Sequence, residues 1–208
     1  MAKILGFCAS PRKAATDYVI QTALEDISKK AGIETDFLTL CKKKISPCNG
    51  CGYCKKNHSW CCIKDDFGPL LDQFLAADAY LIGSPVYVYS PSPQLFAFFS
   101  RMRPLFHIQP DALRTKLGSA IAVGGTRNGG EEMTVNGILN LMMGRGINII
   151  CNEPFGYAGG FVWSKDQGAK GCAEDEEGMG KVMQLANKLA DMTLLLEAGK
   201  KSMKQTGE

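Results

Sequence analysis

The amino-acid sequence predicts an α/β fold in which a five-stranded parallel sheet is covered by helices on both faces. Five short apolar runs alternate with five amphipathic segments along the 208 residues, and such alternation is typical of successive βαβ units. The apolar runs carry few charges, as expected of strands that are buried on both faces. No repeat, low-complexity segment or linker divides the chain, so we expect one domain over residues 1–208.

The first two strands and the helix between them follow from short-range patterns. Residues 3–8 are apolar and precede a polar loop, which predicts a buried strand. Thr16 is expected to cap a helix that runs to about Ala31, because apolar residues then recur on one helical face. Gly32 ends that helix, and residues 33–40 alternate well enough to form the second strand.

The remaining elements show the same alternation. An aspartate at the start of the second helix and a proline in the first turn of the third occupy positions that these residue types favour. Acidic residues precede the last helix, where they interact favourably with the helix dipole. We expect strands over residues 79–83, 117–124 and 147–151, and helices over 66–77, from 93, through 135–142 and from 174 to about 199.

Composition argues against several classes of protein. The net charge is only +3, which gives no support for nucleic-acid binding. Residues 79–100 carry no charge, but Pro85, Pro91 and Pro93 interrupt them, so we expect strand, loop and helix there and no membrane span. No signal-peptide pattern is visible, and we expect a cytoplasmic protein.

Most of the cysteines lie in residues 41–66, which we expect to form a cluster-binding loop inserted between the second strand and the helix that follows it. Nine cysteines cannot all pair internally, and clustered cysteines in a reducing compartment are more often metal ligands or redox groups than disulfides. Cys48, Cys51 and Cys54 recur at every third position, and Cys61 and Cys62 follow. The run resembles that of bacterial ferredoxins, whose thiolates bind iron–sulfur clusters. Zinc is an alternative, since four thiolates also suit it, and so are free or redox-active thiols.

A second candidate site is the loop between the first strand and the first helix. Its hydroxyls, its guanidinium and the N–H groups of the helix start would together favour a phosphate. Neither a G-x-G-x-x-G pattern nor a Walker pattern is present, so no dinucleotide or nucleoside-triphosphate loop is expected. The alternative is an ordinary capped helix with an exposed arginine. The candidate phosphate-binding residues are Ser10, Arg12, Lys13, Ala15 and Thr16.

Two further loops leave the predicted third and fourth strands. Each alone could be a simple proline or glycine turn. In the flavodoxin-like strand order 2-1-3-4-5, however, all three loops open at the carboxyl edge of the sheet, where flavin mononucleotide (FMN) would lie. The candidate residues are Pro85, Val86, Tyr87 and Val88 in one loop, and Gly125, Thr126, Arg127, Asn128, Gly129 and Gly130 in the other.

These three loops resemble the flavin loops of the NADPH-dependent FMN reductase superfamily. The matching stretches are residues 10–12, 84–87 and 124–131. The cysteine run, followed by Ile-Lys-Asp-Asp at residues 63–66, is similar to the iron–sulfur flavoprotein branch of that superfamily. The resemblance implies FMN and a [4Fe-4S] cluster in each subunit, and homodimers that pair into tetramers.

The resemblance also implies a ligand set. The chain departs from the family pattern at two places, and the first is Ala9-Ser10, where the family usually has Gly-Ser before Pro-Arg. The implied cluster ligands are Cys48, Cys51, Cys54 and Cys61, although the adjacent Cys62 could replace Cys61. The phosphate loop ends in Ala-Ala-Thr at residues 14–16, where the family usually has Gly-Asn followed by Thr or Ser. The contact of the Asn side chain is therefore missing, and phosphate binding would depend on backbone N–H groups and an arginine.

The function implied by the resemblance is electron transfer by an FMN-dependent oxidoreductase. Electrons would pass from a ferredoxin-type donor through the cluster to FMN, and then to a small acceptor such as oxygen, peroxide or a quinone. The cofactors carry this chemistry, so no side chain is expected to act as a general acid or base. Arg127 and Tyr87 are candidates for tuning flavin charge.

Two alternative functions are open. One is an NAD(P)H-dependent FMN or quinone reductase with structural cysteines, and the other is a zinc-stapled flavodoxin-like binding module.

Two surface features suggest protein partners. Phe96, Phe98, Phe99 and Met102 are too many for one helical face, so core packing accounts for some of them and the remainder suggests a subunit interface in a homodimer or homotetramer. The basic triplet at residues 42–44 is either a solvated face or a docking patch for an acidic electron-transfer partner.

Overall fold

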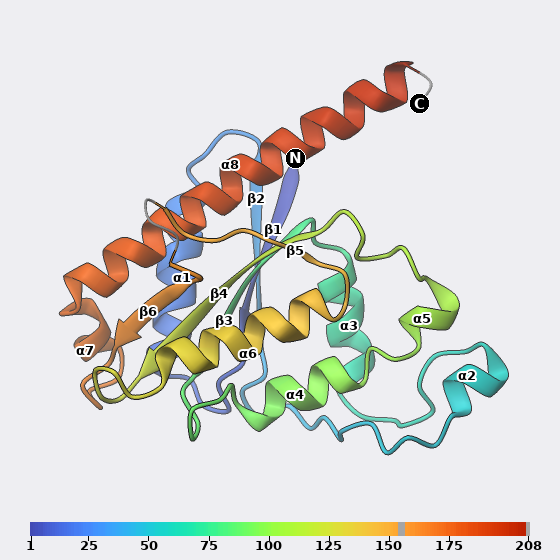
Figure 1. Ribbon diagram of the computed structural model, residues 1–208, viewed down its shortest axis with the longest axis horizontal. Coiled ribbons are helices and arrows are strands. Elements are labelled where there is room, and N and C mark those ends of the chain that lie inside the picture. The colour runs from blue at the N-terminus through green and yellow to red at the C-terminus, as the bar shows by residue number, and fades with distance from the viewer. Residues whose placement is uncertain (154–156, 207–208) are drawn as a thin grey trace.

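The computed structural model describes residues 1–153 and 157–206, and these form a parallel sheet with helices on both faces (Figure 1). Five strands follow the order β2-β1-β3-β4-β5, and a sixth, β6, pairs with β4. The flavodoxin-like order expected from the sequence is therefore confirmed. The strands are β1 (Ala2–Cys8), β2 (Ile33–Thr39), β3 (Ala79–Pro85), β4 (Leu117–Gly124), β5 (Asn148–Ile149) and β6 (Gly160–Trp163).

The fifth position of the sheet differs from the expected strand over 147–151. β5 has two residues and pairs only with the start of β4, whereas β6 pairs with β4 residues 121–124. The chain leaves the sheet after Ile150, and the side-chain amide of Asn152 donates to the carbonyl of Lys181. The long loop that the sequence predicts here lies partly outside the described residues, and β6 was not predicted because four residues are too short for a periodic pattern.

The helices bury two separate apolar layers, one on each face of the sheet. One face packs against α1 (Ala15–Ile27) and α8 (Glu176–Thr206), with the short α7 (Ala169–Ala173) beside them. The other face packs against α3 (Phe67–Leu75), α4 (Pro93–Ser100) and α6 (Glu131–Met143). The remaining short helices are α2 (Tyr53–Asn57) and α5 (Leu105–Ile108).

Several helix boundaries differ from those expected. The N-cap of α1 is Ala14, so Thr16 lies buried within the first turn and is not the cap. The same helix ends at Ile27, short of Ala31, and α8 spans Glu176–Thr206. Asp66 stands at the N-cap position of α3 without a side-chain cap, since its Oδ2 accepts the N–H of Lys44 (2.8 Å) while Asp65 Oδ1 accepts the N–H of Phe67. Local side-chain competition of this kind is invisible to a pattern of apolar residues.

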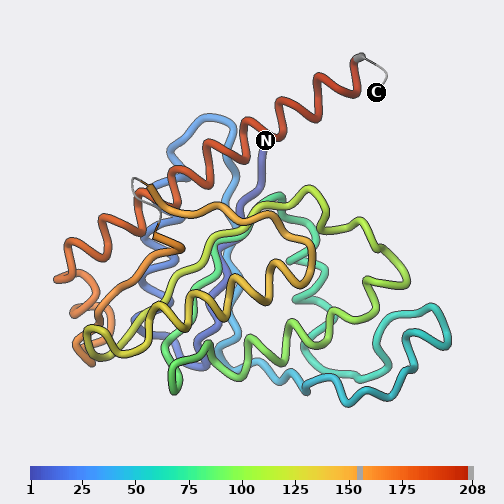
Figure 2. The backbone as a smooth tube through the Cα atoms, in the orientation of Figure 1, coloured from blue at the N-terminus to red at the C-terminus, as the bar shows by residue number. Residues whose placement is uncertain are grey.

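Residues 41–66, called the cysteine segment below, lie between β2 and α3, so the insertion after the second strand is confirmed. In Figure 2 this segment leaves the sheet, runs past α4 and returns after a wide excursion that contains α2. The backbone N–H of Cys48 donates to Ser100 Oγ at the end of α4 (3.1 Å). α4 therefore supports the segment as well as covering the sheet.

The aromatic residues of α4 divide between core and surface. Phe98, Phe99 and Met102 are at most 1% exposed and belong to the core, whereas Phe96 is 42% exposed. Only Phe96 of that predicted group is therefore available for a subunit interface. None of the helices in the described ranges is both long and apolar enough to cross a membrane.

Candidate cofactor sites

The phosphate loop, residues 9–14, closes on itself through Ser10. The Ser10 hydroxyl donates to the carbonyl of Arg12 (2.7 Å) and accepts the Arg12 N–H (3.2 Å). Ala14, the N-cap of α1, has no side-chain cap, so no side chain of the loop occupies the first N–H groups of the helix. Arg12 and Lys13 are exposed beside that helix end. This combination can bind an anionic group such as a phosphate.

The first turn of α1 contains two buried polar residues, Thr16 and Asp17, and neither caps the helix. The methyl group of Thr16 faces Gly83, where an added Cβ would lie 3.2 Å from it. Asp17 is 4% exposed and accepts a hydrogen bond from Gln21 through Oδ2 (2.6 Å), while its Oδ1 has no hydrogen-bond partner in the described chain. Thr16 thus packs α1 onto the sheet next to the loop.

The proline loop, residues 86–92, is tied to the phosphate loop. The Ser92 hydroxyl donates to the carbonyl of Ala9 (2.7 Å), and the Ser92 N–H donates to Ser84 Oγ (2.9 Å). The loop tip is a tight turn between Tyr87 and Ser90. Its two central residues, Val88 and Tyr89, both have positive φ (49° and 60°). That turn normally favours Asn and Gly, so a β-branched residue there is strained.

The glycine loop, residues 125–130, is positioned by hydrogen bonds from β6 and from the residue that follows it. Trp163 Nε1 donates to the carbonyl of Gly125 (2.9 Å), and the N–H and hydroxyl of Ser164 both donate to the carbonyl of Gly124 (2.8 and 2.9 Å). Because these contacts come from a strand that the sequence did not predict, Trp163 and Ser164 were absent from the predicted site.

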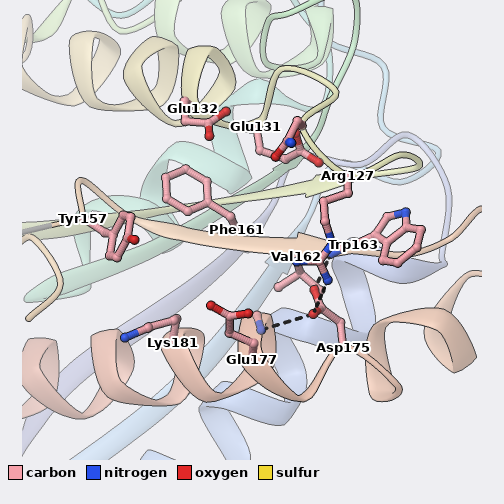
Figure 3. A pocket seen from close by; sticks show the side chains of 13 residues that line it. Arg127, Glu131, Glu132, Tyr157, Phe161, Val162, Trp163, Asp175, Glu177 and Lys181 are labelled. Atoms are coloured by element: carbon pink, nitrogen blue, oxygen red, sulfur yellow. Dashed lines mark hydrogen bonds and ion pairs between the residues drawn. The ribbon is translucent and has the colours of Figure 1, made fainter.

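The side chain of Arg127 points toward β6 and α8. It pairs with Asp175 Oδ1 (3.3 Å), and its guanidinium lies 5.0 Å from the ring centre of Trp163 (Figure 3). Asp175 also accepts the N–H of Trp163 (2.7 Å). These residues form one end of a cavity of about 160 Å³ that also contacts Phe161 and Tyr157. The role of Arg127 in tuning a flavin stays a prediction.

The proline and glycine loops touch through Tyr89 and Gly130. Gly130 has a φ of +109°, and a Cβ built there would lie 2.8 Å from Cδ1 of Tyr89. Only glycine fits this backbone conformation and this close approach. The three predicted loops therefore meet at the carboxyl edge of the sheet, as the sequence indicated, although Tyr89 was not among the predicted residues.

The cysteine segment brings five thiols to one cavity. Its lining includes every predicted ligand together with the alternative one, namely Cys48, Cys51, Cys54, Cys61 and Cys62. Two positive-φ glycines, Gly50 (73°) and Gly52 (72°), turn the chain between the first three cysteines. Among residues 1–153 and 157–206, no three His, Cys, Asp or Glu side chains are placed to hold one metal ion. The predicted donor set is all sulfur, and four thiolates can bind either an iron–sulfur cluster or a zinc ion.

Cys61 and Cys62 have different surroundings. Cys61 is half-buried and interacts with the guanidinium of Arg101, whereas Cys62 is exposed and interacts with Cys51. Desolvation, followed by the hydrogen bond with Cys51 and the charges of Cys51 and Cys61, raises the pKa of Cys62. The choice of Cys61 over Cys62 as the fourth ligand stays a prediction.

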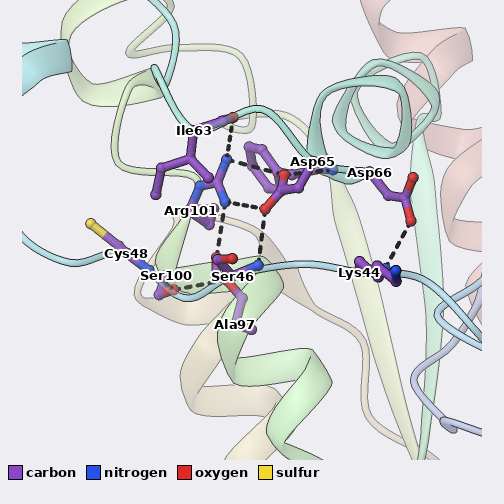
Figure 4. A network of polar contacts seen from close by, with 10 residues as sticks. Lys44, Ser46, Cys48, Ile63, Asp65, Asp66, Ala97, Ser100 and Arg101 are labelled. Atoms are coloured by element: carbon purple, nitrogen blue, oxygen red, sulfur yellow. Dashed lines mark hydrogen bonds and ion pairs between the residues drawn. The ribbon is translucent and has the colours of Figure 1, made fainter.

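Arg101, 1% exposed, lies at the centre of the network that closes the cysteine segment (Figure 4). Its Nη1 donates to Asp65 Oδ2 (2.7 Å) and to the carbonyl of Ser46 (2.9 Å), and its Nη2 donates to the carbonyl of Ile63 (3.1 Å). One guanidinium therefore binds residues before and after the cysteines. The sequence did not point to Arg101, because its partners are distant along the chain.

The same network determines the protonation of Asp65. Burial raises the pKa of the Asp65 carboxyl, but hydrogen bonds from Arg101 and from the N–H groups of Ser46 and Phe67 outweigh burial and hold the pKa below its usual value. Asp65 is therefore ionised at neutral pH and neutralises the buried guanidinium.

Comparison with known proteins finds a family and relatives that match most of the chain. The sequence profile of the family described as NADPH-dependent FMN reductase matches residues 2–150. An iron-sulfur flavoprotein of Archaeoglobus fulgidus is 38% identical over 195 residues, which cover 93% of this chain and 98% of the relative. An iron-sulfur flavoprotein of Methanosarcina thermophila is 34% identical over 196 residues, which cover 94% of this chain and 97% of the relative.

Solved structures share the fold at low sequence identity. A flavone reductase superposes with a TM-score of 0.66 at 18% identity, covering 94% of this chain and 64% of that one. A WrbA-like flavodoxin from Agrobacterium tumefaciens superposes with a TM-score of 0.64 at 15% identity, covering 94% of this chain and 99% of that one. These two likenesses concern the fold alone.

Proposed function

The chain belongs to the NADPH-dependent FMN reductase family, in its iron–sulfur flavoprotein branch, and we propose that it transfers electrons between a [4Fe-4S] cluster and FMN. It is an FMN-dependent oxidoreductase. The observation that carries the proposal is the convergence of five cysteines on one cavity in a chain whose three flavin loops meet at the sheet edge. A cluster exchanges single electrons and a flavin one or two, so together they link one-electron donors to two-electron acceptors.

The residues at the sheet edge would bind FMN in three ways. The uncapped start of α1, with Arg12 and Lys13, would bind the phosphate. The proline loop would lie along the flavin ring, with Tyr87 39% exposed at its tip. The glycine loop would bring backbone N–H groups to the polar edge of the ring, since three of its six residues are glycines, which let a ligand approach the backbone closely.

The cysteine segment would bind the cluster through Cys48, Cys51, Cys54 and Cys61. Arg101 would fix the position of Cys61 and place a positive charge beside the Cys61 sulfur. Positive charges and hydrogen bonds near ligating sulfurs raise the reduction potential of such clusters. Lys56, exposed on α2, would add to this effect.

The donor, acceptor and assembly complete the proposal. A ferredoxin-type protein would supply single electrons, and oxygen, peroxide or a quinone would receive them from the flavin. We propose a homodimer or homotetramer in the cytoplasm. The assembly is supported by a largely apolar groove beside the proline loop, which is lined by Val88, Phe96 and Pro91 among others. The alternative donor is NAD(P)H, which the description of the matching family names.

The test is spectroscopy of anaerobically purified protein. We expect flavin absorption bands, iron and sulfide near four per subunit, and a cluster signal in electron paramagnetic resonance after reduction. A flavin spectrum with stoichiometric zinc and no iron would overturn the cluster. Rapid flavin bleaching by NADPH in a protein whose cluster stays oxidised would favour the alternative donor.

Cysteine variants test the ligand set. Cys51→Ser should lose the cluster and keep FMN, because the flavin loops lie on other elements. Cys61→Ser should lose iron, whereas Cys62→Ser should keep it. The reverse result for the last two variants would reassign the fourth ligand to Cys62.

A further inference from the structure

A second cavity lies on the outer side of Cys48, and every charged side chain that lines it is basic. This cavity, called the basic pocket below, has a volume of about 450 Å³. Within the described ranges no carboxylate contributes to its lining. The lining residues are Cys48, Lys55, Ser100, Arg103, Phe106, His107 and Arg145.

The basic pocket and the cluster cavity share a wall. Cys48 and Arg103 line both of them. Cys48 is held there by the hydrogen bond from its N–H to Ser100 Oγ. An electron carrier seated in the basic pocket would therefore face the cluster across a single ligand residue, which is the short path that electron transfer requires.

Arg145 provides a fixed positive charge in the basic pocket. It is half-buried, its Nη2 donates to the carbonyl of Phe99 (2.8 Å), and its guanidinium lies 5.0 Å from the ring centre of Phe106. A partly desolvated guanidinium that pairs with no carboxylate of residues 1–153 and 157–206 favours an incoming anionic group. Arg145 thus presents an oriented charge, whereas Lys55 on α2 is exposed.

The surroundings of the pocket favour a protein over a small anion. Phe106 is 59% exposed beside Arg145, and protein interfaces are enriched in aromatic residues and arginine. A free phosphate or carboxylate would pair with the basic side chains but would leave the Phe106 ring exposed to water. An acidic protein surface would cover the basic side chains and the ring together.

We propose that the basic pocket is the docking site of an acidic, ferredoxin-type electron carrier. Carboxylates of the carrier pair with Lys55, Arg103 and Arg145, and its redox centre stands opposite Cys48. One electron passes from the reduced carrier to the oxidised cluster, so the carrier is oxidised by one electron and the cluster is reduced by one. No bond forms or breaks. This inference rests on the function proposed above and assigns a surface to its donor.

The experiment uses the anaerobic protein with its cofactors and a reduced bacterial-type ferredoxin as the probe. Stopped-flow spectroscopy gives the second-order rate constant of cluster reduction at several salt concentrations. The combined variant Lys55→Glu and Arg103→Glu should lower this rate constant at low salt by about tenfold or more and flatten its salt dependence, because rim charges act on association rates. The combined control variant Lys201→Glu and Lys204→Glu makes the same change in net charge on α8 and should stay within about twofold of the wild type.

Reduced methyl viologen, a small cationic donor, separates docking from damage to the cluster. It should reduce the cluster of the Lys55 and Arg103 variant at least as fast as that of the wild type. A loss of rate with both donors, together with a shifted cluster potential, would mean that the substitutions act on the cluster, and the docking proposal would be rejected.

A binding measurement tests the docking site without relying on electron transfer. Fluorescence anisotropy of labelled ferredoxin should show saturable binding that the Lys55 and Arg103 variant loses and the α8 control keeps. Equal binding to all three proteins would overturn the proposal. Binding of inorganic phosphate without binding of ferredoxin would identify a small-anion site instead.

Two outcomes distinguish the failure of docking from the failure of the proposed function. If the wild-type cluster accepts electrons from methyl viologen but neither binds nor accepts electrons from ferredoxin, the docking surface is rejected and the cluster–flavin function stands. If the purified protein contains no cluster, the proposed function fails, while the binding measurement still decides whether the pocket recognises an acidic protein.

Discussion

At the scale of single residues, a buried guanidinium holds both ends of the cysteine segment. Arg101 binds carbonyls of Ser46 and Ile63 and pairs with Asp65, whose side chain is only 9% exposed. Removing one partner of a buried ion pair leaves the other charge uncompensated, which costs more free energy than the pair itself contributes. A residue outside the cysteine segment therefore controls whether the ligands stay together.

Arg101→Met should destabilise the segment and reduce cluster loading. We expect a loss of about 3 kcal/mol in the free energy of unfolding, because Asp65 would stay buried without a counterion, together with a loss of bound iron. Denaturant unfolding and iron analysis measure the two effects. Arg103→Met, which also alters the lining of the cluster cavity, is the matched control. Equal losses in both variants would contradict the role assigned to Arg101.

Acid should weaken the same ion pair. The pKa of Asp65 is lowered in the folded protein, so its stabilising contribution is present above the unfolded pKa of about 4 and is lost as pH falls through the folded value. The difference in unfolding free energy between wild type and Arg101→Met should therefore shrink on acidification. A difference that stays constant well below pH 4 would show that Asp65 does not titrate against Arg101.

Gly130 is the second residue whose role is set by its surroundings. Gly130→Ala should weaken FMN binding by about tenfold, because its positive φ is strained for any other residue and the new methyl group would displace Tyr89. Gly146→Ala is the control, since Gly146 also has positive φ (79°) but has no atom within 4 Å of an added Cβ. It should lower stability without changing FMN affinity, as measured by fluorescence titration. Equal FMN affinities of the two variants would show that the contact between Gly130 and Tyr89 does not affect FMN binding.

At the scale of elements, β6 and the start of α8 support the glycine loop. Asp175, one residue before α8, accepts the N–H groups of Trp163 and Gly178 and pairs with Arg127. Trp163 in turn binds the carbonyl of Gly125. The loop that would approach the flavin ring is thus positioned by elements that follow it by more than thirty residues.

Asp175→Ala should loosen the glycine loop. We expect a loss of about 1–3 kcal/mol in stability, since the variant leaves the Trp163 N–H without its acceptor, and a weaker affinity for FMN. Glu177→Ala, two residues further along in the first turn of α8 and also lining the cavity of Figure 3, is the matched control and should change neither quantity. Thermal unfolding and FMN titration distinguish the two variants. Unaltered FMN affinity in Asp175→Ala would show that the loop does not depend on this support.

At the scale of the whole molecule, the two candidate cofactor sites lie on separate supports. The flavin loops emerge from the sheet, whereas the cysteine segment rests on α4 through Ser100 and Arg101. The apolar groove of Phe96 lies between the proline loop and the start of the cysteine segment, with Ile45 and Pro47 in its lining. A second subunit packed there would therefore contact both sites.

Phe96→Glu tests that assembly. A charge in the apolar groove should shift the protein toward monomers in analytical ultracentrifugation, while FMN stays bound because Phe96 is not part of the flavin loops. Leu195→Glu, at an exposed apolar position on α8, is the control and should leave the assembly unchanged. An identical sedimentation profile for wild type and Phe96→Glu would place the interface elsewhere.

The sequence by itself determined the strand order, the three loops at the carboxyl edge and the spacing of the cysteines. These features depend on local patterns, namely apolar runs, glycine and proline turns, and thiols close together along the chain. It also placed Thr16 as a helix cap and residues 147–151 as a strand, where neighbouring groups in space compete with the local preference. Only the tertiary structure decided those points, together with the roles of Arg101, Tyr89, Trp163 and Asp175 and the existence of the basic pocket. Each depends on partners that are distant in sequence, and no pattern along the chain records such pairings.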